Sequence, residues 1–357
     1  MKVIVMGAGV IGVTTAWYLA QEGHEVEVID RQPGVGLETS FANAGQVSPG
    51  YSTPWAMPGL PLKAAKWMFE KHSPLVVRPR FDTAMFRFMG ELLMNCTEKA
   101  YDINKGRMLR IAEYARDRLD ALRAETGITY DGAQKGLIQL FRTDSQVEYA
   151  AEDMRLLAES GVEHKLLTVD EILAREPGLA HARHLLKAGL LLPGDQTGDA
   201  HLFTRRLAKM AEEKGVKFHL GVTIEALEAA SDAIVSIRTS AGRMTADRYV
   251  LALGSYSPRF LKPLELRLPI YPVKGYSLTM PITDESRAPV STVNDETYKV
   301  AITRLGDRIR IGGTAELNGF NLRLSPDRRE TLELSFSEMY GGGDLSSAKY
   351  WTGLRPC

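Results

Sequence analysis

Cysteine is scarce in this sequence, since only Cys96 and Cys357 occur among 357 residues. Two cysteines cannot form a disulfide framework or a four-ligand zinc site, which fits a reducing compartment. The seven histidines are scattered without the H-x-x-x-H spacing of zinc enzymes. The sequence therefore predicts no metal site.

An excess of charge of one sign is also missing. The 44 Lys and Arg residues balance 44 Asp and Glu residues, so no overall field draws the protein to nucleic acid or to an anionic membrane. Any such contact would have to be local. The sequence contains no run of 18 apolar residues that would indicate a transmembrane helix, and no internal repeat.

What is present begins near the N-terminus, with a strand, a glycine turn and a helix in immediate succession. The β-branched run from Val3 to Met6 is typical of a strand buried in a parallel sheet. Gly7, Gly9 and Gly12 follow in G-x-G-x-x-G spacing. Gly7 would make the tight turn, Gly9 would admit a pyrophosphate, and Gly12 would let the helix pack against the strand. This order predicts a dinucleotide-binding unit.

A second strand is predicted from Val26 to Ile29, and Asp30 ends it. A carboxylate about 20 residues past the glycines can accept hydrogen bonds from both hydroxyls of an adenosine ribose, and it repels the 2′-phosphate of NADP. Two plainer explanations are a glycine-rich loop of another α/β domain and, for Met1 to Ala20, a signal peptide. The register of strands, glycines and acid argues against both.

A small, polar segment follows from Glu38 to Gln46, with the sequence E-T-S-F-A-N-A-G-Q. Such residues make a poor core but permit close approach to a ligand, although a plain surface loop has the same composition. The glycine motif, Asp30 and this segment together resemble the D-amino acid oxidase superfamily of FAD-dependent enzymes, and most closely the small subunits of bacterial D-amino acid dehydrogenases. The resemblance implies FAD rather than NAD.

The resemblance also implies which residues contact FAD. The segment from Ser40 to Gln46 would line the pyrophosphate and isoalloxazine side. Val222 would touch the adenine end, and Gly254 would provide a second backbone approach, so that both converge with Asp30 on one cofactor. The residues predicted to bind FAD are Val3, Val5, Gly7, Ala8, Gly9, Val10, Ile11, Gly12, Trp17, Asp30, Arg31, Ser40, Ala42, Asn43, Gly45, Gln46, Val222 and Gly254.

A substrate site is implied by the last residues. Tyr350 to Pro356 is similar to the W-x-G-L-R-P segment of the superfamily, whose arginine, here Arg355, pairs with the substrate carboxylate. Tyr276 would either hydrogen-bond that carboxylate or simply pack. Relatives continue with a stretch that returns to the flavin, whereas this sequence stops at Cys357. We therefore expect a truncated product, for which complete cofactor binding stays open.

The expected fold is α/β, with a Rossmann-like, glutathione-reductase-like FAD-binding domain and an α+β substrate domain built on an antiparallel sheet. The FAD-binding domain would take residues 1–85 and 196–256, and the substrate domain would take 86–195 and 257–345. Residues 346–357 would begin the return to the FAD-binding domain.

Local patterns add four expectations. An amphipathic helix is predicted from Lys105 to Thr126, with Ile111 on its apolar stripe. A hairpin is predicted from two strands, residues 233–239 and 243–249. Lys63 to Lys71 is predicted to be helical. The apolar run Met85 to Met94 would pack in the core, which we favour from the sequence, or contact a membrane.

The activity implied by the resemblance is oxidation of small D-amino acids, typically D-alanine, to imino acids that hydrolyse to 2-oxo acids and ammonia. Arg355 would hold the carboxylate while a hydride passes from Cα to flavin N5, and a quinone or other carrier would take the electrons. The resemblance also suggests peripheral attachment to the cytoplasmic side of the inner membrane. An NAD-dependent dehydrogenase and a non-catalytic flavin or dinucleotide sensor stay open as alternatives.

Overall fold

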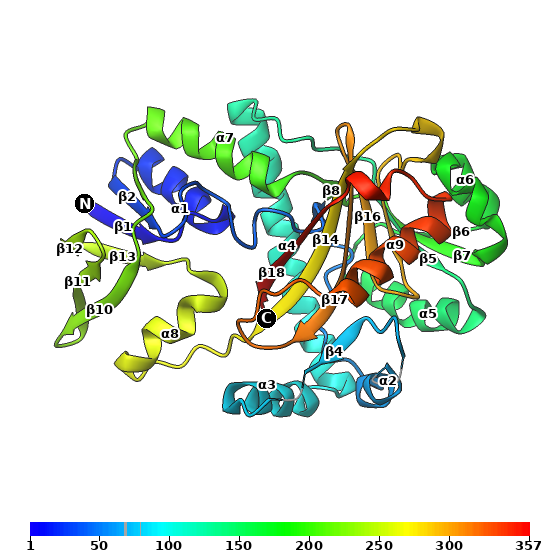
Figure 1. Ribbon diagram of the computed structural model, residues 1–357, viewed down its shortest axis with the longest axis horizontal. Coiled ribbons are helices and arrows are strands. Elements are labelled where there is room, and N and C mark those ends of the chain that lie inside the picture. The colour runs from blue at the N-terminus through cyan, green and yellow to red at the C-terminus, as the bar shows by residue number, and fades with distance from the viewer. Residues whose placement is uncertain (68–69, 79) are drawn as a thin grey trace.

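A computed structural model describes residues 1–67, 70–78 and 80–357 and shows two lobes, each built around its own large sheet (Figure 1). Met68, Phe69 and Pro79 lie outside the described residues. The helix predicted from Lys63 to Lys71 is confirmed as far as Trp67, where α2 (Leu60–Trp67) ends, whereas Glu70 and Lys71 are not helical.

A four-stranded parallel sheet forms the centre of the first lobe. Its order is β13 (Arg248–Leu251), β1 (Lys2–Met6), β2 (Glu25–Asp30) and β9 (Lys217–Leu220). Trp17 of α1 (Val10–Gln21) and Leu207 of α7 (Ala200–Glu213) pack with Val5 on one face. The other face packs on a small antiparallel sheet of β10 (Ile224–Ala230), β11 (Ala233–Thr239) and β12 (Gly242–Met244).

The second lobe holds a nine-stranded sheet whose neighbours are mostly antiparallel. Its order is β18 (Lys349–Pro356), β14 (Pro272–Pro281), β17 (Arg308–Leu317), β16 (Val300–Leu305), β15 (Thr292–Asp295), β5 (Leu137–Phe141), β7 (Ala188–Leu192) and β6 (Lys165–Leu167), with β4 (Leu75–Val77) beside β17. Within the described part of this sheet, only the pairs of β15 with β5 and of β17 with β4 run parallel.

Helices cover both faces of this sheet. Phe336 of α9 (Pro326–Tyr340) packs against Ile302 on one face, and Leu157 of α5 (Asp144–Glu159) packs against Leu190 on the other. The remaining elements, apart from short 3-10 turns, are β3 (Gln46–Val47), α3 (Thr83–Met94), α4 (Glu98–Thr126), α6 (Val169–Arg175), β8 (Gln196–Thr197) and α8 (Ser257–Leu261).

Two further local predictions need correction. The helix predicted from Lys105 begins earlier, after the cap Thr97, and Ile111 is 69% exposed rather than part of a buried stripe. The second strand of the predicted hairpin is divided, because β12 ends at Met244 and β13 pairs with β1 in the parallel sheet. Alternation of apolar residues is the same in both pieces, so it could not reveal where the chain leaves one sheet for the other.

Candidate cofactor and substrate site

The glycine turn after β1 is packed so tightly that neighbouring protein atoms leave no room for a side chain at two of its glycines. Gly7 has φ of 107°, and a Cβ there would lie 2.5 Å from the carbonyl oxygen of Ala252. A Cβ on Gly12 would lie 1.8 Å from the carbonyl oxygen of Gly7. Any side chain at either position would therefore push the helix away from the sheet.

Gly9 is different, because protein atoms leave room for a side chain there. The nearest heavy atom to a Cβ on Gly9 would be Ser40 Oγ, at an ordinary contact distance of 3.4 Å. Gly9 is the N-cap of α1 and supplies no side chain to cap it, while Ser40 Oγ accepts a hydrogen bond from the Val10 N–H at 3.0 Å. The space at this helix N-terminus suits an anionic group.

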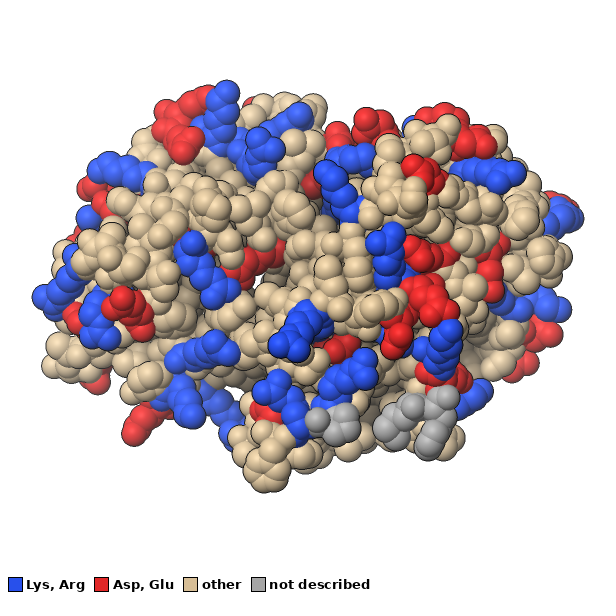
Figure 2. All heavy atoms as spheres, in the orientation of Figure 1, with Lys and Arg blue, Asp and Glu red and all other residues tan. Residues whose placement is uncertain are grey.

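A cavity of about 710 Å³ opens at this turn and extends to β10, β13, α8 and the end of β18. Figure 2 shows the surface hollowed between the left lobe and the middle of the molecule. Its volume is that of a typical ligand pocket. The structure brings these predicted residues together in its wall: Gly7, Gly9, Val10, Ile11, Asp30, Arg31, Ser40 and Gly254.

Other predicted residues lie behind or beyond the wall. Val3, Val5, Ala8 and Trp17 are buried in the first lobe, and Gly12 packs against the turn. Val222 does not line the cavity, although its neighbour Thr223 does. The remaining four, Ala42, Asn43, Gly45 and Gln46, lie between the lobes, where they contact Ser277, Arg310, Leu305 and Thr292 of the nine-stranded sheet.

Asp30 has a role that its sequence position did not reveal. Its Oδ2 accepts a hydrogen bond from the Ala8 N–H at 2.7 Å, and its Oδ1 accepts one from the Gln32 N–H at 2.8 Å. Burial raises its pKa above the ordinary value. The carboxylate thus braces the glycine turn, while its remaining lone pairs stay available at the cavity wall for the predicted ribose contact.

Two hydroxyls missed by the sequence analysis join the lobes. The carbonyl oxygen of Leu354 accepts hydrogen bonds from Thr39 Oγ1 at 2.7 Å and from Ser255 Oγ at 3.2 Å. Each donor is adjacent to a predicted cofactor residue, Ser40 or Gly254, and this adjacency is the only signal in the sequence. Residues 346–357 thus reach the first lobe, although β18 itself belongs to the nine-stranded sheet. The domain boundaries stay a prediction.

The structure does not bring the two predicted substrate residues together. Arg355 pairs with Val273 across the strands, whereas Tyr276 pairs with Thr352. Successive side chains of a strand point to opposite faces, so Tyr276 and Arg355 lie on opposite sides of the sheet. The Tyr276 hydroxyl donates to Glu316 Oε2 at 2.7 Å, and its ring stacks on Tyr350. These contacts favour the second alternative for Tyr276, in which it packs within the protein and does not bind the substrate carboxylate.

Arg355 has the features of an unpaired cation. Its half-buried guanidinium donates to the carbonyl oxygen of Thr314 and lies 5.5 Å from the centre of the Trp55 ring. No carboxylate among the described residues forms a salt bridge with it, and burial lowers its pKa. Leu354 and Pro356 line the cavity, but Arg355 turns away from it. An anion is the ligand that this environment lacks.

Comparison with known proteins decides the family. A family model described as "FAD dependent oxidoreductase" (DAO) matches residues 2–357. The chain belongs to this oxidoreductase family. FAD is therefore its cofactor, as predicted, and the NAD-dependent alternative is set aside. The predicted fold class, a Rossmann-like FAD-binding unit with a second α+β unit, is confirmed as well.

Two relatives of this oxidoreductase have the same name. A protein of Methylobacterium nodulans named D-amino acid dehydrogenase is 58% identical over 358 residues, which cover 100% of this chain and 85% of the relative. One from Cereibacter sphaeroides with the same name is 57% identical and covered to 82%. Among solved structures, glycine oxidase from Geobacillus kaustophilus has a TM-score of 0.73 at 22% identity, covering 99% of this chain and 83% of that one, which shows a shared fold.

The cavity of this FAD-dependent oxidoreductase fits its cofactor. The strongest observation is the space at Gly9, which the protein leaves open although it closes the space at Gly7 and Gly12. Gly9 and Ser40 would hold the pyrophosphate beside the N-terminus of α1, and Asp30 would face the ribose. FAD supplies the hydride acceptor when bound.

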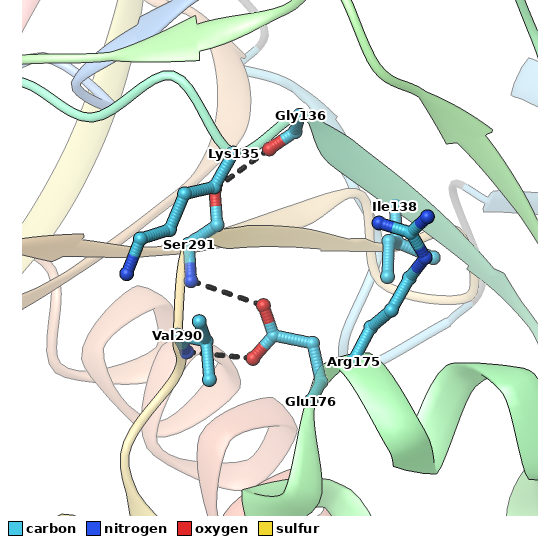
Figure 3. A pocket seen from close by; sticks show the side chains of 7 residues that line it. All are labelled: Lys135, Gly136, Ile138, Arg175, Glu176, Val290 and Ser291. Carbon is cyan, nitrogen blue, oxygen red and sulfur yellow. Dashed lines mark hydrogen bonds between the residues drawn. The ribbon is translucent and has the colours of Figure 1, made fainter.

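A second cavity of the oxidoreductase, about 270 Å³ in volume, lies in the other lobe around Glu176 (Figure 3). The Glu176 carboxylate accepts hydrogen bonds from the N–H groups of Val290 at 2.7 Å and Ser291 at 3.0 Å. In Figure 3, Lys135 and Arg175 lie on either side of the carboxylate and do not pair with it. Burial raises the pKa of Glu176 to about 7.

The raised pKa predicts how the stability of the oxidoreductase depends on pH. Between the ordinary value of 4.5 and about 7, the folded protein holds a proton on Glu176 that the unfolded chain has lost. This contribution to the free energy of unfolding is complete below pH 4.5 and lost as pH rises through 7, and amounts to about 3 kcal/mol. The urea-denaturation midpoint should therefore fall as pH rises from 5 to 8, with a slope against pH roughly twice that of Glu176→Gln. The slope that remains in the variant comes from Asp195, whose pKa is also raised to about 7 by burial. Equal slopes in the two proteins would contradict the assignment.

Proposed function

We propose that this oxidoreductase oxidises small D-amino acids to 2-imino acids, which hydrolyse to 2-oxo acids and ammonia. The observation that carries the proposal is the half-buried Arg355 guanidinium, which no described carboxylate pairs. A free substrate carboxylate supplies the missing charge. The name D-amino acid dehydrogenase, carried by relatives 56–58% identical over the whole chain, supports this substrate class.

The contribution of the chain to the reaction is to bind and orient. The planar guanidinium of Arg355 would bind the carboxylate through two parallel hydrogen bonds, which fixes the rotation of the substrate as well as its place. The indole of Trp55, beside the guanidinium, would cover the substrate and exclude water. Holding Cα–H in one direction is the step that such a site supplies to hydride transfer.

The experiment is to purify the chain with FAD, record its visible spectrum, and add D-alanine without oxygen. The proposal predicts that the yellow flavin absorbance is bleached by D-alanine and not by L-alanine. A yellow protein that no D-amino acid bleaches would contradict the proposal and favour a non-catalytic flavin sensor. Equal bleaching by both enantiomers would contradict the D-amino acid class while leaving an amino acid oxidation.

We further propose that the electrons pass to a quinone and that α3 rests on the cytoplasmic surface of the inner membrane. Met85 and Phe88 turn inward onto Tyr271, while Phe86, Leu93 and Met94 of the same helix are exposed. The neighbouring Phe81 is 96% exposed and Leu62 is 80% exposed. The contact that we propose is peripheral, through exposed apolar side chains. No helix among the described ranges is long and apolar enough to cross a bilayer.

Replacing two residues of this surface should release the protein from lipid. The double variant Phe86→Glu/Leu93→Glu should lose about tenfold or more of its binding to vesicles of anionic bacterial lipids, because each exposed apolar side chain contributes about 1.5–3 kcal/mol when buried. Flotation on a density gradient measures the bound fraction. Ile111→Glu, on the exposed part of α4, is the matched control and should bind as the wild type does. Equal binding of all three proteins would reject the membrane surface.

A further inference from the structure

Thr314 has an unusual backbone conformation for its residue type. Its φ is 58°, in the left-handed region that a β-branched residue rarely adopts. The other non-glycine residues of the described chain with positive φ are Asp131, Ser231, Glu265 and Lys299, and none of them is β-branched. Thr314 is 3% exposed and lies in β17 where the register with β14 shifts, between Lys274 and Tyr276. Strain of this kind is commonly found at functional sites.

The polar groups of Thr314 point to what this conformation does. Its carbonyl oxygen, turned out of the regular ladder, accepts the hydrogen bond from Arg355 Nη2. Its hydroxyl is buried and has no hydrogen-bond partner. A buried hydroxyl without a partner lowers the stability of the fold, and the protein nevertheless retains this one.

Space for the Arg355 guanidinium at this point comes from Gly275. Gly275 lies on β14 beside Gly353 of β18, and a Cβ on it would lie 2.8 Å from Arg355 Nη2. The absence of a side chain at Gly275 thus lets the guanidinium lie flat against the sheet. Trp55, Gly275, Thr314 and Arg355 are brought together on the face of the sheet away from α9.

We propose that Thr314 is a second anchor of the substrate carboxylate beside Arg355. Its carbonyl oxygen fixes the orientation of the guanidinium, and its hydroxyl donates a hydrogen bond to a carboxylate oxygen of the substrate. The inference rests on the proposed function for the identity of the substrate. The chemistry that it requires is only a small carboxylate, so it can be tested without a reaction.

The experiment compares Thr314→Val with Thr314→Ser in the FAD-loaded protein. Valine keeps the branched shape and the backbone strain but removes the hydroxyl, whereas serine keeps the hydroxyl. Binding of propionate, a carboxylate without an amine, is followed by the shift in flavin absorbance, and thermal unfolding gives Tm. We expect Thr314→Val to bind propionate about tenfold or more weakly, with Tm unchanged or raised by about 2 °C, since the unsatisfied group is gone. Thr314→Ser should bind as the wild type does.

Thr331→Val is the matched control. Thr331 is also fully buried, but its hydroxyl donates to the carbonyl oxygen of Asp327 within α9. This variant should lose Tm and keep its affinity for propionate, the opposite pattern. Unchanged propionate affinity in Thr314→Val, or equal losses in the valine and serine variants, would overturn the inference. If Thr314→Val does not fold, Thr314→Ala carries the same comparison.

The failure of the proposed function can be distinguished from the failure of this inference. If D-alanine does not reduce the wild type but Thr314→Val loses propionate binding, the carboxylate anchor stands and the reaction assignment falls. If D-alanine does reduce the wild type, an unchanged apparent KM in Thr314→Val rejects the anchor and leaves the reaction assignment standing.

Discussion

Gly9→Val is expected to remove FAD from the purified protein while leaving the protein folded. The physical reason is the contrast within the glycine turn, because only Ser40 Oγ comes near a Cβ on Gly9, at 3.4 Å. A valine there would occupy the space beside the N-terminus of α1 that the pyrophosphate requires. We expect FAD affinity to fall about 100-fold or more, and the ratio of flavin to protein absorbance measures the loss.

Gly12→Ala provides the matched comparison for this experiment. A Cβ on Gly12 would lie 1.8 Å from the carbonyl oxygen of Gly7, so this variant should lose Tm or fail to fold. Gly9→Val should have the same circular dichroism and Tm as wild-type protein from which FAD has been removed. A Gly9→Val protein with normal flavin content would show that the phosphate site lies elsewhere.

Arg355→Ala should nearly abolish reduction of the enzyme by D-alanine. Removing a guanidinium that pairs with the substrate carboxylate costs about 2–5 kcal/mol of interaction, much of it from leaving the other charge unpaired. This corresponds to a loss of about 30-fold to several thousand-fold in kcat/KM. Arg355→Lys should recover only part of it, because an ammonium is a point charge and not a planar fork.

The measurement for Arg355 is anaerobic stopped-flow reduction of the flavin, with a spectrum of each variant to establish that FAD is bound. Arg155→Ala is the control, since it removes an exposed guanidinium that pairs with Glu152 and Glu159 on α5. That variant should react as the wild type does. An Arg355→Ala protein that keeps its flavin and its apparent affinity and rate would remove Arg355 from the substrate site.

The FAD-binding turn could be predicted because its signal is local. Gly7, Gly9, Gly12 and Asp30 owe their roles to spacing along a single strand-turn-helix-strand unit, which the fold reproduces. Tyr276 shows the limit of such reasoning. Whether it faces the substrate depends on the parity of strand register between β14 and β18, segments about seventy residues apart, and no local pattern contains that register.

The sequence analysis missed other residues of the site for the same reason, because their roles depend on contacts between distant segments or on backbone geometry. Thr39 and Ser255 meet at the carbonyl oxygen of Leu354 only because three distant segments converge, and Thr314 stands out by a backbone angle that threonine itself does not favour. A preference-based prediction assigns a β-branched residue between two strand residues to a regular strand. Strained positions are where such predictions are expected to fail.

The carbonyl oxygen of Leu354 has a consequence for the thermodynamics of the two ligands. Its donors, Thr39 and Ser255, belong to the cofactor cavity, and the next residue along the strand is Arg355. Cofactor and substrate therefore act on one short piece of backbone from its two sides. The factor by which bound FAD increases the affinity for a carboxylate must equal the factor by which a bound carboxylate increases the affinity for FAD. If that factor exceeds one, a carboxylate in excess raises the apparent affinity of the protein for FAD.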